Sequence, residues 1–101
     1  MSRIDGGTKD IPTAGTRVQI STKATRVHII WFTAESGNTG DVWIAFNAVA
    51  ANAGYPLAPD GTANRETALK LDFGDRSIAL NNIYLDTDTD GNDVHWLALI
   101  D

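Results

Sequence analysis

The residues with the clearest potential for chemistry lie in the acidic segment Asp86-Thr87-Asp88-Thr89-Asp90-Gly91. Carboxylates at alternate positions followed by glycine are typical of the start of a calcium loop, because hard cations prefer oxygen ligands. We therefore take Asp86, Asp88 and Asp90 as candidate calcium ligands. The twelfth position of such a loop requires a bidentate Glu, and the chain has Leu97 there. The alternative is a hairpin turn, since Asp, Asn and Gly suit the backbone of turns.

The other residue types predict no catalytic centre. The two histidines, His28 and His95, have no neighbouring ligand in the sequence, whereas a zinc site needs three or four ligands. There is no cysteine, no Gly-x-Ser-x-Gly motif and no glycine-rich phosphate loop. We therefore expect a protein that is not an enzyme and that has no cofactor, calcium excepted.

Aromatic residues offer a second kind of site. The three tryptophans, Trp31, Trp43 and Trp96, could fill the core or could form a platform for a sugar. A platform requires two or three of these rings to be exposed and coplanar. A carbohydrate-binding module is therefore kept as an alternative function.

Length and charge limit the classes of partner. The 101 residues suffice for one small domain, and the net charge of −5, with scattered basic residues, argues against nucleic-acid binding. The longest apolar run, Ile29–Phe32, is far shorter than the roughly 20 residues that span a bilayer. The N-terminus lacks the apolar stretch of a secretory signal. We expect a soluble domain, made in the cytoplasm, without membrane contact.

The elements that must position these residues are predicted to be strands. Residues 1–15 are polar and lack apolar periodicity, which predicts an extended N-terminal arm. Residues 16–101 are predicted to form one all-β domain, a small β-sandwich or barrel of six to eight short antiparallel strands. Alternating and β-branched segments place strands at 16–21, 25–34, 41–46, 68–73, 77–80, 83–86 and 94–100.

Two segments between these strands are predicted to be irregular. The alanine-rich residues 47–54 are expected to form a loop or a single helical turn. Residues 55–61 are expected to form a structured loop, because their prolines lack amide donors for a sheet. Two strands, around Ile29–Phe32 and Trp96–Ile100, are apolar on both faces. They are expected to be covered on both sides, in part by another subunit.

Five segments occur in an order that resembles small virion proteins of tailed bacteriophages. The resemblance covers residues 15–100 and consists of turn and core motifs, which specify a fold and a context rather than an activity. The segments are Gly15-Thr16-Arg17-Val18-Gln19-Ile20, Val27-His28-Ile29-Ile30-Trp31-Phe32, Asn38-Thr39-Gly40-Asp41-Val42-Trp43-Ile44, Gly54-Tyr55-Pro56-Leu57-Ala58-Pro59-Asp60-Gly61 and Ile83-Tyr84-Leu85.

The resemblance implies a structural protein of the virion, foremost a capsid decoration (cement) protein that binds the major capsid protein and stabilises the head. A tail, collar or fibre-base component is the alternative within the virion. Such proteins are homo-oligomers, with a trimer favoured, and are made in the host cytoplasm. We expect the contacts to come from the arm and from one face of the last strand. The candidate interface residues are Arg3, Ile4, Lys9, Ile11, Trp96, Leu97 and Leu99.

Overall fold

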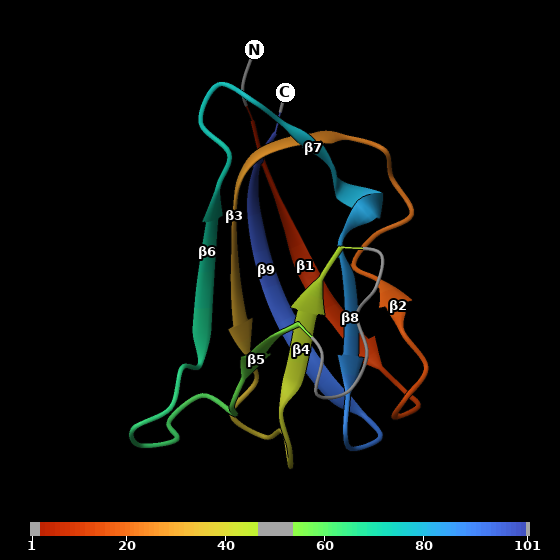
Figure 1. Ribbon diagram of the computed structural model, residues 1–101, viewed down its shortest axis with the longest axis vertical. Helices are drawn as coiled ribbons and strands as arrows, with labels where there is room; N and C mark the ends of the chain where they lie inside the picture. The colour runs from red at the N-terminus through yellow and green to blue at the C-terminus, as the bar shows by residue number, and fades with distance from the viewer. Residues whose placement is uncertain (1–2, 47–53, 101) are drawn as a thin grey trace.

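The computed structural model describes residues 3–46 and 54–100 and places them in two antiparallel β-sheets that form a sandwich (Figure 1). The first sheet has the strand order β1-β9-β3-β6, with β7 also paired to β3, and the second has the order β2-β8-β4-β5. The predicted all-β class is therefore confirmed. The first sheet contains β1 (Arg3–Ile11), β3 (Arg26–Ala34), β6 (Ala68–Asp72), β7 (Ile78–Ala79) and β9 (Asn92–Ile100). The second contains β2 (Val18–Gln19), β4 (Val42–Ala45), β5 (Tyr55–Leu57) and β8 (Tyr84–Thr87), and the 3-10 helix η1 (Leu80–Asn82) precedes β8.

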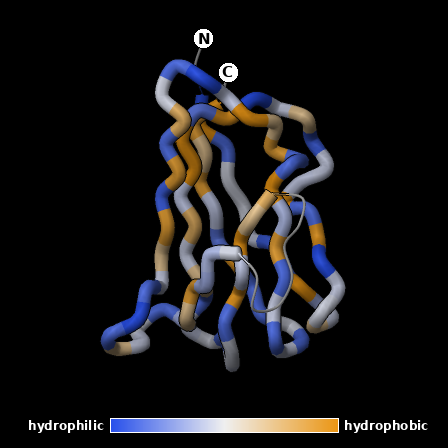
Figure 2. Tube along the Cα trace, viewed as in Figure 1, coloured by the Kyte–Doolittle hydropathy of each residue, from blue (hydrophilic) through white to orange (hydrophobic). Residues whose placement is uncertain are grey.

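The core lies between the two sheets. Because successive side chains of a strand point to opposite faces, every second residue of each long strand is directed into this space. Figure 2 shows apolar and polar positions alternating along the strands. The buried apolar side chains are those of Ile11, Ile20, Val27, Ile30, Phe32, Ala34, Val42, Ile44, Leu57, Leu80, Ile83, Leu85, Val94, Ala98 and Ile100.

A register shift in β3 explains part of its unusual apolar run. Val27 pairs with Ile100 and Ile29 pairs with Leu99, so His28 is an extra residue in the ladder. Such an insertion reverses the alternation, which lets both Val27 and Ile30 face the core. Ile29 is only half-buried, and Trp31 is exposed. The expectation that this strand is covered on both faces is therefore wrong within the monomer.

The N-terminal segment belongs to the sandwich. Residues Arg3–Ile11 form β1, which pairs with β9 along its entire length, from Arg3 opposite Ile100 to Ile11 opposite Asn92. Ile11 is fully buried. The predicted arm is not confirmed, because the backbone hydrogen bonds of this ladder compensate for the weak apolar pattern of the segment.

A proline-containing strand is the second departure from expectation. Tyr55–Leu57 forms β5, with Pro56 opposite Trp43 of β4, whereas a loop was predicted. The strand lies at the edge of the second sheet, where a residue without an amide donor leaves no ladder bond unmade. The predicted strand at 16–21 shortens to Val18–Gln19, and the predicted turn at 47–54 falls almost wholly outside the described residues.

The acidic segment connects the two sheets. It joins β8 of the second sheet to β9 of the first, so these consecutive strands do not pair with each other. The expected hairpin is therefore wrong, since the connection is an arch over the end of the sandwich. Within residues 3–46 and 54–100, no helix has the length and apolar composition needed to cross a bilayer.

Neighbouring residues of β3 provide a test of the sandwich. Phe32 is 1% exposed in the core, whereas Trp31 is 39% exposed on the opposite side of the sheet. We expect Phe32→Ala to lower the free energy of unfolding by about 3–5 kcal/mol, because it leaves a cavity. Trp31→Ala, the matched control, should cost much less. Urea denaturation of both variants measures this, and equal losses would contradict the assignment of the two faces.

Candidate interaction surface

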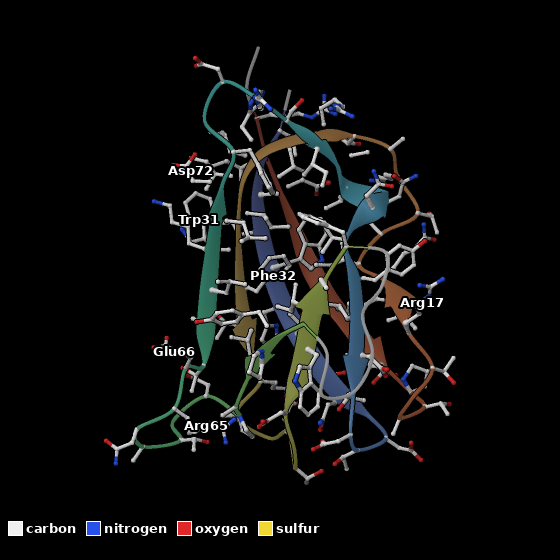
Figure 3. All side chains as sticks on the ribbon, in the orientation of Figure 1. Arg17, Trp31, Phe32, Arg65, Glu66 and Asp72 are labelled. Atoms are coloured by element: carbon white, nitrogen blue, oxygen red, sulfur yellow. The ribbon has the colours of Figure 1, made fainter. Side chains whose placement is uncertain are left out.

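The outward side of the first sheet carries a group of apolar side chains. Ile4 of β1, Leu97 and Leu99 of β9, and Ile29 and Trp31 of β3 all point away from the second sheet. We call these five residues the outer patch. Ile4 is 68% exposed, Leu97 46% and Trp31 39%. Figure 3 shows Trp31 directed away from the interior and Phe32 directed into it.

Strand register makes the outer patch contiguous. Ile4 is opposite Leu99, and Leu99 is opposite Ile29, which gives one row across three strands. In the next row Leu97 is opposite Trp31. Directly opposed side chains of antiparallel strands lie close enough to touch, so the rows merge into one apolar surface. A shallow groove of about 250 Å³ adjoins it, lined by Trp31, Thr33, His95, Trp96 and Leu97.

The structure divides the predicted interface residues into two groups. Ile4, Leu97 and Leu99 lie together in the outer patch. Ile11 is fully buried, and Trp96 is half-buried and packs against the core, so these two face inward. Arg3 and Lys9 lie along β1 at the edge of the first sheet. Trp31 and Ile29 were not among the predicted residues, although the two-faced apolar run around them was the signal for them.

A carboxylate pair borders this side of the sheet. Asp10 of β1 is directly opposite Asp93 of β9, and Glu35 lies near Asp93. The Asp93 carboxylate raises the pKa of Asp10, because a hydrogen bond between the two carboxyls requires a proton. Burial, and then Glu35, raise the pKa of Asp93. The hydrogen bond with Asp10, and then the charge of His95, lower the pKa of Asp93, and Lys9 lowers the pKa of Asp10, but the net direction is upward for both carboxyls.

The candidate calcium ligands mainly bind the backbone. The Asp86 side chain is 1% exposed and accepts hydrogen bonds from the amides of Gly15 (3.0 Å) and Thr87 (2.8 Å). Asp90 accepts one from the amide of Ala14 (2.7 Å), and Asp88 is exposed. Among the described residues, no three His, Cys, Asp or Glu side chains are grouped closely enough to hold a metal ion. The structure therefore does not bring the three carboxylates together, and calcium binding stays a prediction.

The histidines and tryptophans are also separated. The His28 ring bonds to the Arg76 carbonyl (3.0 Å), and the His95 ring bonds to the Thr8 hydroxyl (2.8 Å). Trp43 is only 7% exposed, and it lies in the other sheet from Trp31 and Trp96. Trp31 and Trp96 project from opposite faces of the first sheet. The three rings therefore do not form a coplanar platform.

A second apolar hollow lies at the open side of the sandwich. Its volume is about 250 Å³, and it is lined by Ile44, Ala45, Phe46, Tyr55, Leu69, Leu71 and Ile83. The lining residues come from β4 and the residue after it, from β5 and β6, and from the segment before β8. Its apolar residues have no distinctive spacing in the sequence and meet only in the folded chain, so the sequence did not predict this hollow.

Comparison with known proteins gives no relative: no family model, no curated protein and no solved structure matches this chain.

The role of Asp86 can be tested by truncation. We expect Asp86→Ala to lower the free energy of unfolding by about 1–3 kcal/mol, because the buried Thr87 amide loses its acceptor and the Gly15 amide keeps only the Thr87 carbonyl oxygen (3.2 Å). The exposed Asp88→Ala should change it by less than about 0.5 kcal/mol. Equal effects would contradict the structural role. Repeating the thermal melts in millimolar calcium tests the calcium hypothesis, which requires a higher Tm for the wild-type chain.

The carboxylate pair makes stability depend on pH. Because the pKa values of Asp10 and Asp93 are raised on folding, the folded chain binds more protons than the unfolded chain above about pH 4. Stability should therefore fall as the pH rises through the raised pKa values. We expect Asp10→Asn to raise the Tm at pH 7 and to leave it nearly unchanged at pH 3.

The control for this effect is Asp75→Asn, which removes one negative charge from an exposed aspartate in the turn after β6. Thermal melts across the pH range should show a smaller effect for this variant. An equal gain for both variants at pH 7 would mean that net charge, and not the pair, sets the pH dependence.

Proposed function

We propose that this chain is a structural protein of a bacteriophage virion, a capsid decoration protein that binds the major capsid protein and stabilises the head. It acts by binding and not by catalysis. We expect to find it bound to the virion. The observation that supports this best is the outer patch, where Ile4, Leu97 and Trp31 are exposed on three neighbouring strands of one sheet face.

The outer patch is unfavourable while it is exposed to water. Each exposed apolar side chain loses the favourable free energy of burial, about 25 cal/mol for each Å² that stays in water. Isolated exposed apolar residues are common, but contiguous apolar patches on a small domain mark interaction sites. The polar Thr8, Asp10 and Lys70 lie around the patch, as polar residues do at the rim of protein interfaces.

The resemblance to phage virion proteins supplies the kind of partner. A protein that binds only the assembled shell adds free energy to that state by mass action. Many symmetric copies then multiply a modest affinity per site. A rigid sheet face suits this task because it loses little conformational entropy on binding.

The test is the amount of the chain in purified particles of the phage that encodes it. Quantitative mass spectrometry should give a copy number that matches the repeated positions of the capsid. A copy number near six or twelve would indicate the tail or collar and contradict decoration, and absence from the particle would contradict a virion role.

The outer patch is tested in the same particles. We expect Leu97→Asp to reduce capsid occupancy at least about tenfold, because binding would bury an unpaired charge. Asp75→Asn, away from the patch, is the control and should keep full occupancy. Both variants must first show wild-type thermal melts. Unchanged occupancy with Leu97→Asp would show that another surface makes the contact.

A further inference from the structure

The free edge of the first sheet differs from the other edges of the sandwich. β1 is nine residues long and contains no proline. The four other edge strands are shorter: β6 has five residues, β7 and β2 have two each, and β5 has three including Pro56. Short edges and prolines prevent pairing with other chains, and β1 has neither of these protections. It has charged residues instead, Arg3, Asp5 and Lys9, which prevent pairing except with a strand of complementary charge. The middle of β1, at Gly6, Gly7 and Thr8, is exposed.

We propose that two copies of this chain pair through β1, antiparallel and edge to edge, around a two-fold axis at Gly7. This pairing goes beyond the proposed function and does not depend on it, since it uses the edge of the sheet and not the outer patch.

Symmetry restricts the register of such a pair. Two identical edge strands that lie side by side and antiparallel are related by an axis perpendicular to the sheet. That axis keeps inward residues opposite inward residues, so one residue of β1 must face its own copy. The central candidates are Gly6, Gly7 and Thr8.

Charge selects among these three registers. With the axis at Gly7, Asp5 is opposite the partner's Lys9, and the symmetry makes this contact twice. With the axis at Gly6, Arg3 would be opposite the partner's Lys9, which is repulsive. With the axis at Thr8, Asp5 would be opposite the partner's Ile11 and would gain no charge partner. Opposed unlike charges stabilise a strand pair and like charges destabilise it, so the Gly7 register is favoured.

Asp5 has present contacts that it could exchange for a contact with the partner's Lys9. Asp5 accepts a hydrogen bond from the Gly6 amide (2.9 Å), and its other oxygen is 4.0 Å from the Lys23 ammonium. The Lys23 side chain is 68% exposed, and such a long, exposed ion pair contributes little. The Lys9 ammonium of a second copy can therefore replace Lys23 beside Asp5 at a small cost in free energy.

Packing within the monomer requires glycine at position 6. A Cβ there would lie 2.8 Å from the Trp96 carbonyl oxygen, which is too close. A Cβ at Gly7 would meet the Trp96 indole at 3.4 Å, an ordinary contact, so the fold does not require glycine at position 7. The residue on the proposed axis can therefore be changed to test the pairing.

The pairing has a consequence for the outer patch. The four strands β1-β9-β3-β6 of each copy would join into one continuous sheet, with both outer patches on the same side. Ile4, at the edge of each patch, would lie near the junction. The dimer would thus present a doubled apolar surface, and its two-fold symmetry differs from the trimer that the resemblance implies.

The first experiment uses the full chain. It measures the mass of the particle in solution and tests the charge complementarity by substitution. Sedimentation equilibrium should give twice the 10.9 kDa of the chain. Lys9→Glu and Asp5→Lys should each weaken dimerisation at least about tenfold, because both symmetric contacts become repulsive. The exchanged variant, Asp5→Lys with Lys9→Asp, should restore the dimer. Lys70→Glu on β6 is the matched control and should remain dimeric.

The second experiment fixes the axis. Because the chain has no cysteine, Gly7→Cys introduces a single thiol that faces its own copy. Under oxidation we expect a disulfide-linked dimer for Gly7→Cys and none for Lys70→Cys. Circular dichroism must show that each variant is folded.

Several results would overturn the proposal. One is a chain that stays monomeric at a concentration of about 1 mM, where even weak specific association is measurable. Another is a trimer. A third is a folded exchanged variant that does not recover the dimer. A dimer that Lys9→Glu leaves unchanged would also overturn it. Presence of the chain in virions is measured separately, so failure of this pairing and failure of the proposed function are distinguishable.

Discussion

The position of β9 between β1 and β3 is the constraint on which the rest of the structure depends. All nine residues of β9 pair with β1, and most of them also pair with β3. Because side chains alternate along a strand, this double pairing determines which face every residue of the three strands occupies. A shift by one residue would expose Val94 and Ala98 and bury Leu97. The core, the outer patch and the Asp10–Asp93 pair are therefore all consequences of one register.

Buried polar groups hold the two sheets in this relation. The connections between the sheets bring Thr87 and Asn92 into the interior, where both are almost fully buried. The Asn92 side chain donates to the Thr87 hydroxyl (2.7 Å) and accepts from the Thr39 amide (3.0 Å), and the Thr87 hydroxyl donates to the Asp41 carbonyl (3.0 Å). No buried side-chain nitrogen or oxygen in the described part of the chain lacks a partner. These hydrogen bonds fix the path of the β3–β4 and β8–β9 connections, because a buried polar group without a partner would lower the stability of the fold.

The same constraint links the two proposals. β1 has one unpaired edge because β9 occupies the other, and the outer patch is contiguous because its rows follow the ladder from β1 to β3. An edge strand and an apolar face on one sheet would let the chain associate in two directions, sideways through hydrogen bonds and face-on through burial. A small domain that must join copies of itself to a larger surface needs both kinds of contact.

The sequence by itself determined the all-β class, because period-two alternation and glycine-rich turns depend only on local backbone geometry. It also identified Leu97 and Leu99 as apolar residues in excess of what a small core can bury. It could not determine that residues 3–11 form a strand, since their pairing with β9 depends on residues 81 to 97 positions away. The edge position of Pro56 and the separation of Asp86, Asp88 and Asp90 were likewise decided by the tertiary structure. In each case strand order and register, which are non-local, determined which groups meet.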